Sequence, residues 1–113
     1  MKYKFPRKLR LTTEAQFKQV YKARQKISTE IFNVYYCYNN ANYPRLGVIV
    51  PKRNIKDSSR RNYFKRLIRE DFRLKQYKFK NIDIVIFVNN KADSVPKKEL
   101  NLFLEKQLSR LVS

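Results

Sequence analysis

Residues 58–73 read Ser-Ser-Arg-Arg-Asn-Tyr-Phe-Lys-Arg-Leu-Ile-Arg-Glu-Asp-Phe-Arg, and this stretch has the periodicity of a helix with two different faces. At about 100° per residue, one arc collects the apolar residues Phe64, Leu67, Ile68 and Leu74. The opposite arc carries the residues that we call the cationic ridge: Asn62, Lys65, Arg66, Arg69 and Arg73. The spacing predicts a helix that buries its apolar arc and presents a ridge about three turns long.

The composition of the ridge favours phosphate binding over a merely solvated surface. Solvated helix faces usually combine Glu with Lys at i,i+4 spacing, whereas this arc contains no carboxylate. Arginine predominates on it, and the planar guanidinium group matches the oxygens of a phosphate. Asp57 or Ser58 is expected to cap the helix, and the free amides of its first turn add a further attraction for phosphate. We therefore interpret the ridge as a surface for a polyanion.

The overall charge points to the same kind of partner. The chain has 113 residues, which is enough for a single domain that buries roughly two thirds of its unfolded surface, and its 27 Lys and Arg against 9 Asp and Glu give a net charge of +18. Such a charge requires nucleic acid or an anionic membrane as a partner. No apolar run approaches the roughly 18 residues of a spanning helix, and residues 1–10 do not resemble a targeting segment. We expect a nucleic acid, no membrane partner and a cytoplasmic location.

Enzymatic groups are scarce in the sequence. It contains no His, one Cys and one Gly, which excludes a conventional zinc site, a Ser-His-Asp or Cys-His arrangement and a Gly-rich phosphate loop. Cys37 lies in an apolar run and is expected to be a buried small residue. The carboxylates show no spacing that specifies a two-metal nuclease site. We therefore expect no catalytic residue, no metal site and no cofactor bound by the protein itself.

The remaining elements follow from capping, turn and periodicity signals. A capping box at Thr13 to Gln16 predicts a helix over residues 14–24, and strands are expected at 31–38 and 45–50, joined as an antiparallel hairpin. The ridge helix should run to about residue 75, and the apolar segment 82–88 predicts a strand buried on both faces, in parallel pairing next to a crossover helix. A final helix is expected over residues 94–111, with Pro96 in its first turn and a buried stripe of Leu100, Leu104, Leu108 and Leu111.

Residues 61–70 resemble the signature of the protein subunit of bacterial ribonuclease P, which reads Arg-Asn-Arg, one residue, Lys-Arg, two residues, Arg. The chain departs from this pattern at Tyr63, where the family has its second arginine, so that a phosphate contact is replaced by a ring that stacks on a base, donates its hydroxyl or packs on the sheet. The resemblance covers essentially the whole chain. Its supporting matches are 5–11, 16–17, 44–48, 50–54 and 83–86.

The resemblance implies an α+β fold in the order α-β-β-β-α-β-α, with a four-stranded mixed sheet, helices packed against it and a left-handed β-α-β crossover, similar to a domain found in ribosomal proteins. Handedness statistics alone favour a right-handed crossover. The family has three strands before the ridge helix. The first should therefore be a short segment near Ile27, or a part of residues 27–38.

The function that the resemblance implies is assistance to a ribozyme that removes the 5′ leader of precursor tRNA, with one protein per catalytic RNA, with magnesium required by the RNA and with no DNA partner. The residues implied to bind the catalytic RNA are Lys52, Arg53, Arg61, Asn62, Lys65, Arg66, Arg69 and Arg73. The residues implied to bind the leader, by stacking on its bases, are Phe17, Tyr21 and either or both of Tyr35 and Tyr36.

Several alternatives remain open from the sequence. Phe17 and Tyr21, at i and i+4, would show the same spacing if they only packed in the core. A structural ribosomal protein or an RNA chaperone would have the same charge, and a carboxylate nuclease would cleave RNA without a partner. A helix-turn-helix DNA-binding protein fits poorly, because the basic helix lies between predicted strands.

Overall fold

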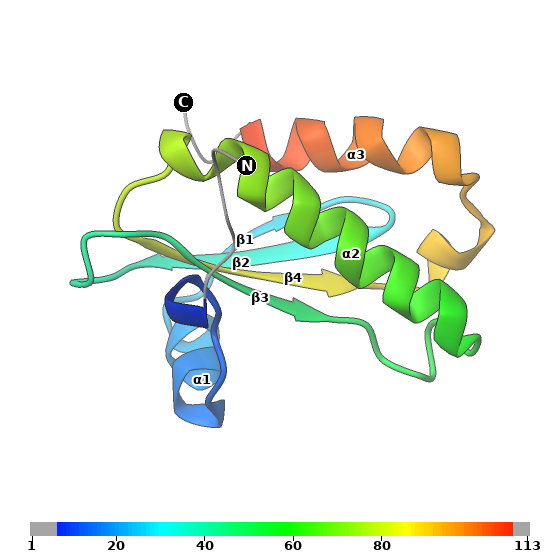
Figure 1. Cartoon of the computed structure of the whole chain (residues 1–113). Coiled ribbons are helices and arrows are strands. Elements are labelled where there is room, and N and C mark those ends of the chain that lie inside the picture. The colour runs from blue at the N-terminus through cyan, green and yellow to red at the C-terminus, as the bar shows by residue number, and fades with distance from the viewer. Residues whose placement is uncertain (1–6, 110–113) are drawn as a thin grey trace.

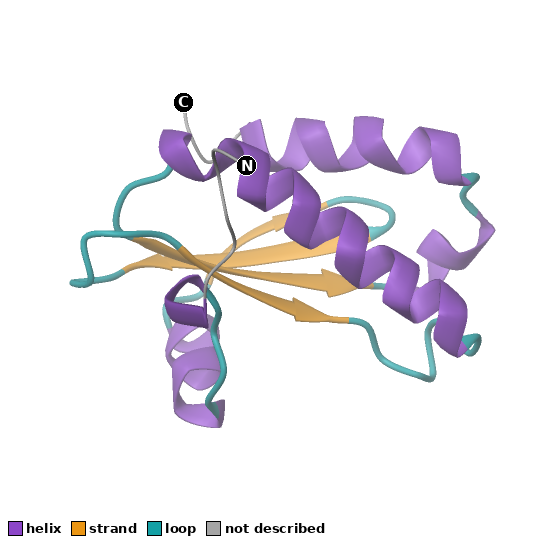
Figure 2. Cartoon of the chain, in the orientation of Figure 1, coloured by secondary structure: helices purple, strands orange, loops and turns teal. Residues whose placement is uncertain are grey.

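The computed structural model describes residues 7–109 as one four-stranded sheet with helices on both faces (Figures 1 and 2). The α-helices in this range are α1 (Glu14–Lys22), α2 (Ser58–Lys75) and α3 (Lys97–Ser109). The strands are β1 (Gln25–Ser28), β2 (Phe32–Tyr38), β3 (Arg45–Ile49) and β4 (Ile82–Val88). Short 3-10 helices are η1 (Arg7–Leu9), η2 (Gln76–Lys78) and η3 (Asn90–Ser94). The predicted α+β class and order of elements are confirmed, and β1 is the short strand expected near Ile27.

The strand order is β1-β2-β4-β3, so the sheet is mixed. β2 pairs antiparallel with both β1 and β4, while β3 pairs parallel with β4. The predicted hairpin between residues 31–38 and 45–50 is therefore wrong, because β4 lies between those two strands. β4 is apolar on both faces apart from Asp83, and a central position buries it more completely than an edge would. The antiparallel hairpin of this fold is β1-β2.

The crossover through α2 has the left-handed sense implied by the family resemblance. In Figure 1 the arrows of β3 and β4 both point to the right, β3 lies nearer to the viewer, and α2 lies above the sheet. α3 lies on the same face as α2, whereas α1 covers part of the opposite face (Figure 1). The two faces of the sheet therefore support separate surfaces.

The larger core lies between the sheet and the helices α2 and α3. Its fully buried members include Phe32 and Ile84 from the sheet and Ile68 from α2. The smaller core, under α1, contains Leu11, Val20, Cys37 and Val85. Alternate residues of one strand point to opposite faces, which is why β2 and β4 contribute to both cores. The prediction that Cys37 is buried is confirmed.

Helix α2 buries a slightly different arc from the predicted one. Phe64, Ile68 and Phe72 are 0% exposed, whereas Leu67 is only partly buried and Leu74 is 49% exposed. The prediction that Leu74 faces the core is wrong, because the row i, i+4, i+8 that starts at Phe64 places the centre of the buried arc near Ile68. The helix begins as expected, with the side chain of Asp57 accepting a hydrogen bond from the Ser59 amide at 2.9 Å.

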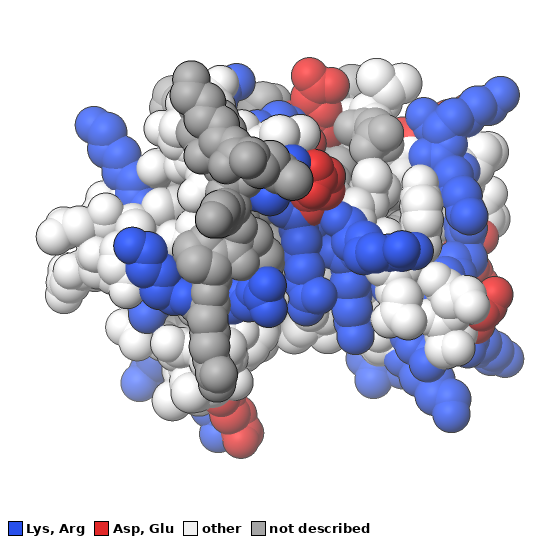
Figure 3. Space-filling model, viewed as in Figure 1, with Lys and Arg blue, Asp and Glu red and all other residues white. Residues whose placement is uncertain are grey.

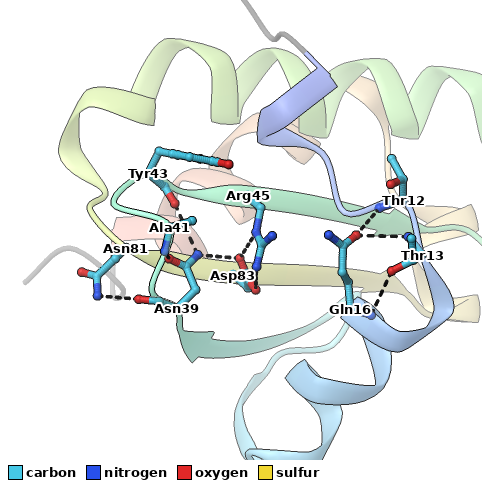
Figure 4. Close-up of polar contacts among 9 residues, drawn as sticks. All are labelled: Thr12, Thr13, Gln16, Asn39, Ala41, Tyr43, Arg45, Asn81 and Asp83. Atoms are coloured by element: carbon cyan, nitrogen blue, oxygen red, sulfur yellow. Dashed lines mark hydrogen bonds and ion pairs between the residues drawn. The ribbon is translucent and has the colours of Figure 1, made fainter.

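The other helices follow their predictions with shifted ends. In the capping box of α1 the Thr13 hydroxyl accepts from the Gln16 amide at 3.2 Å and Gln16 Oε1 accepts from the Thr13 amide at 3.1 Å (Figure 4). α1 ends at Lys22 because the chain turns at Arg24, whose φ is 56°. Leu100 and Leu104 of α3 are buried as predicted. The side chain of Leu108 and all of Leu111 lie outside the described part of the chain.

Candidate nucleic-acid interface

The cationic ridge lies on the outer side of α2, facing away from the sheet. Asn62, Arg66 and Arg69 are exposed and Lys65 is half-buried. Together with Ser59 these four side chains line a shallow hollow of about 380 Å³. Figure 3 shows this side of the molecule with many Lys and Arg and few Asp and Glu. The hollow brings several positively charged groups within reach of one anionic chain.

One residue of the ridge differs from the prediction in its electrostatics. Glu70 pairs with Arg73, whose Nε donates to Glu70 Oε2 at 3.0 Å and whose Nη2 donates to Oε1. This guanidinium lowers the pKa of Glu70 and the carboxylate raises the pKa of Arg73. Glu70 is not one of the ridge residues, but it pairs with Arg73 and offsets the charge of that guanidinium at the C-terminal end of the ridge.

Arg10 is a cation beside the ridge that sequence reasoning missed. It follows η1, forms an isolated parallel bridge with Leu46 and lines a hollow of about 640 Å³ together with Arg66 and Arg69. Burial lowers the pKa of Arg69, and the nearby charge of Arg10 lowers it further. No helical periodicity connects residue 10 with residue 69, and only the pairing of the entry segment with β3 brings the two side chains together.

The basic connection before α2 is held close to the start of the ridge. The amides of Asn54 and Ile55 donate to the Pro51 carbonyl at 3.0 Å each, and the Asn54 side chain donates to the Val88 carbonyl at 2.9 Å. This turn leaves Lys52 and Arg53 exposed.

Arg61 connects the same turn to the helix. Its Nη1 donates to the carbonyls of Ile55 at 2.9 Å and Lys56 at 2.8 Å. The family resemblance implies an RNA contact for Arg61, and the structure adds a positioning role, because this side chain fixes the connection that carries Lys52 and Arg53.

The opposite face of the sheet carries an aromatic cluster under and beside α1. The rings of Tyr21 and Tyr35 meet edge to face with centroids 4.8 Å apart, and the Lys26 ammonium lies 5.6 Å from the centroid of the Tyr35 ring. Tyr21 is 36% exposed, and burial of its hydroxyl, followed by the neighbouring Tyr35, raises its pKa. We call Phe17, Tyr21 and Tyr35 the aromatic face.

Phe17 lies on β3 at the position of the single glycine. A Cβ atom at Gly47 would come within 2.4 Å of Phe17 Cε1, so the flat approach of this ring requires a residue without a side chain. Phe17 remains partly exposed and packs against the smaller core. The structure therefore gives Phe17 both a packing role and an accessible edge.

Tyr36 does not belong to this face. It packs against the larger core, on the side of α2 and α3, whereas Tyr35 packs against the smaller core. Adjacent residues of a strand point to opposite faces, so only one of the two tyrosines could line the cleft that the resemblance implies. We remove Tyr36 from the candidate leader site.

The next row of the sheet extends the aromatic face beyond the predicted residues. Asn33 of β2 and Ile49 of β3 both pair with Phe87 of β4, and all three are partly exposed. Phe87 is two residues from Val85, the partner of Tyr35. Because every second residue of a strand points to the same face, Phe87 and its two partners share the α1 face with Tyr35. Sequence reasoning missed Phe87, although the alternation within 82–88 places it on the same face as Val85.

The carboxylates of the described residues mostly serve structural contacts. Asp83 is buried and accepts two hydrogen bonds from Arg45, at 2.7 and 2.8 Å, and one from Asn39 at 2.6 Å (Figure 4). Asp57 caps α2, and Asp71 pairs with Lys75. Among residues 7–109 no three His, Cys, Asp or Glu side chains gather as metal ligands. None of the described helices is long and apolar enough to cross a membrane.

The mixed four-stranded sheet carries a cationic helix on one side and an aromatic face on the other. This arrangement is that of a small RNA-binding protein of the α+β class. Residues 5–112 match the family model described as Ribonuclease P. A "Ribonuclease P protein component" from Aliivibrio fischeri is 37% identical over 111 residues, which cover 98% of this chain and 95% of the relative. The chain therefore belongs to the ribonuclease P protein family, as the resemblance of residues 61–70 predicted.

Solved structures agree with this assignment. The RNase P protein of Staphylococcus aureus superposes with a TM-score of 0.85 at 26% identity, covering 93% of this chain and 98% of that one. The RNase P protein of Thermotoga maritima gives a TM-score of 0.73 at 28% identity, with 91% and 94% covered. The similarity therefore extends over nearly the whole fold and not only over the ridge motif.

Proposed function

We propose that this chain binds two RNA molecules through two faces, the catalytic RNA through the cationic ridge and the precursor-tRNA leader through the aromatic face. As a member of its family, the chain is the protein component of ribonuclease P, the endoribonuclease that removes the 5′ leader of precursor tRNA. The family match and the solved structures both support this function. They do not support the alternative roles of a structural ribosomal protein or an RNA chaperone. The observation that carries the two-face proposal is the placement of ridge and aromatic cluster on opposite sides of one sheet.

The ridge supplies the contacts to the catalytic RNA in this proposal. Its exposed guanidinium groups line one hollow, and phosphate neutralisation by such groups releases counterions, which is the main source of affinity for nucleic acid. Arg73 contributes less than the others, because Glu70 already pairs with it. The proposed residues are Lys52, Arg53, Arg61, Asn62, Lys65, Arg66 and Arg69, with Arg10 added from the structure.

The aromatic face receives the single-stranded leader. Stacking on aromatic rings tolerates any base, since every base has a π-face, and nearby cations hold the backbone. Tyr21 and Tyr35 offer rings beside Lys26, and Phe17 and Phe87 extend the same face. This arrangement fits a leader whose sequence differs from one precursor to the next.

The chemistry of cleavage belongs to the RNA. The protein contributes positive charge that allows two polyanions to approach each other, and the magnesium ions that the reaction needs are assigned to the RNA partner. One protein is expected per catalytic RNA, with the whole chain acting as a single RNA-binding domain in the cytoplasm.

The test is reconstitution. The purified protein is mixed with a bacterial ribonuclease P RNA and a 5′-extended tRNA, and leader removal is followed at limiting magnesium. The proposal predicts that the protein stimulates cleavage and that the protein without RNA cleaves nothing. Cleavage by RNA-free protein would contradict it and point to a nuclease that acts alone.

A further inference from the structure

The ridge signature of this chain has a tyrosine, Tyr63, where the family pattern has an arginine, and the structure shows what surrounds it. The ring of Tyr63 is partly buried and meets Phe64 at a centroid distance of 6.4 Å and an angle of 74°. The side chain thus packs partly against the larger core. Tyr63 itself brings no positive charge to this point of the surface.

A lysine from another helix supplies the missing charge. Lys97 is the first residue of α3, and its ammonium group lies 4.5 Å from the centroid of the Tyr63 ring. A cation at this distance is attracted by the negative face of the ring. Residues 63 and 97 are far apart in sequence, so no motif could reveal this pair.

The place where α3 begins is fixed by Arg60 of α2. Its Nε donates to Asp93 Oδ1 at 2.8 Å, and its Nη2 donates to the carbonyls of Asp93 at 3.0 Å and Val95 at 2.9 Å. This guanidinium holds the segment that leads into α3 against α2. Arg60 therefore acts as a positioning residue for Lys97, because these hydrogen bonds between α2 and the start of α3 place the Lys97 ammonium over the Tyr63 ring.

Lys97 and the ridge open onto one space. Arg66, a ridge residue, and Lys97 both line a hollow of about 260 Å³, together with Tyr63, Arg60 and, at the start of α2, Asp57 and Ser59. The Asp57 carboxylate serves the helix cap, where it accepts a hydrogen bond from the Ser59 amide at 2.9 Å. Lys97 is exposed, so its ammonium group has donors available to a ligand while the ring holds it in place. A phosphate in this hollow would meet positive charges from both helices, Arg60 and Arg66 of α2 and Lys97 of α3, against the carboxylate of Asp57.

We propose that Lys97, held on the ring of Tyr63, binds a phosphate of the catalytic RNA and replaces the arginine that the family pattern has at position 63. The RNA-binding surface then extends from α2 to the start of α3. This inference rests on the proposed role of the ridge, and the experiment below separates the two.

The experiment measures the affinity of the full chain for a bacterial ribonuclease P RNA across a series of salt concentrations. Lys97→Ala should weaken binding about three- to tenfold at moderate salt, as expected for one charge-assisted contact. The slope of log K against log salt should become shallower by somewhat under one unit. Lys98→Ala, which removes the same charge from the neighbouring exposed position, should change affinity by less than twofold.

A compensating variant sharpens the test. Tyr63→Arg in the Lys97→Ala background should restore the affinity and the salt slope, because it returns the charge to the helix that carries the family motif. Circular dichroism on each variant verifies that it is folded. Equal effects of Lys97→Ala and Lys98→Ala, or no recovery with Tyr63→Arg, would overturn the inference.

Arg66→Ala distinguishes this inference from the function on which it rests. If Arg66→Ala weakens binding and Lys97→Ala does not, the ridge stands and the role of Lys97 is wrong. If neither variant differs from the wild type, the ridge assignment fails together with the inference.

Discussion

The cationic ridge and the aromatic face bind nucleic acid by different physics and are built in different ways. The ridge comes from one helix, α2, and its charges act over a distance that salt shortens. The rings of the aromatic face come from α1, β2 and β4, with Lys26 of β1 beside them, and these rings act only on direct contact. The comparison teaches that a charged surface can be encoded within one short segment, whereas a stacking surface requires the completed fold.

The largest expected effect separates the buried side of α2 from its ridge. Ile68→Ala removes a fully buried side chain from the larger core and should lower the free energy of unfolding by about 2 to 5 kcal/mol. Leu74→Ala, on the same helix but 49% exposed, is the matched control and should change stability by well under 1 kcal/mol. Thermal or urea unfolding measures both. Equal losses would show that the buried arc of α2 is assigned wrongly.

The next effect tests how the aromatic face is supported. Gly47→Ala places a Cβ within 2.4 Å of Phe17 Cε1, so the ring must move, at a cost of about 1 to 3 kcal/mol in stability. Combining Gly47→Ala with Phe17→Ala removes the clash with the ring and leaves the tight approach to Leu11 Cβ at 3.3 Å, so the double variant should lose clearly less than the sum of the two single losses. An additive loss in the double variant would mean that the glycine is needed for another reason.

A comparable or smaller effect is expected on the ridge itself. Arg69→Ala should weaken binding to the catalytic RNA by about 1 to 2 kcal/mol, with a shallower salt dependence and unchanged thermal stability. Lys80→Ala, an exposed lysine away from the ridge, provides the control for a general loss of charge. If the two variants bind equally, the ridge is only a solvated face.

The smallest effect concerns Glu70, the carboxylate that pairs with Arg73 beside the ridge. Arg73 lowers the pKa of Glu70, so this carboxylate stays ionised at neutral pH and Glu70→Gln removes a full negative charge. Affinity for the catalytic RNA should rise slightly at low salt, because a surface charge pair contributes little, and the gain should shrink as salt is added. A loss of affinity would show that the pair orients Arg73 for its contact.

How far the sequence predicted the structure depends on whether a feature is local. The ridge, the capping box at Thr13 and the doubly buried strand 82–88 each lie within one segment, and the structure places them as expected. The hairpin prediction failed because local turn signals do not specify that β4 inserts between β2 and β3. The prediction for Leu74 failed because the position of the sheet beneath the helix decides that Phe72, and not Leu74, is buried.

The candidate site shows the same division. Tyr35 and Tyr36 face opposite sides of the sheet because they are adjacent in one strand. Which of these sides α1 covers is decided by tertiary packing, so the sequence could not show which tyrosine lies beside α1. Arg10, Lys26 and Phe87 lie in extended segments where no helical spacing marks them. Lys26 pairs with Tyr35 within the β1-β2 hairpin, whereas Arg10 bridges to Leu46 and Phe87 pairs with Asn33, each more than 30 positions away.

The measurement that tests the two-face account most directly is the affinity of the assembled particle for two precursor tRNAs that differ only in leader length. In Tyr21→Ala the ratio of long-leader to short-leader affinity should fall by the factor that corresponds to about 1 to 3 kcal/mol of lost stacking, while Arg69→Ala and the exposed control Tyr38→Ala should leave the ratio at its wild-type value. An unchanged ratio in folded Tyr21→Ala protein, or an equal fall in Arg69→Ala, would contradict the assignment of separate faces to the leader and the catalytic RNA.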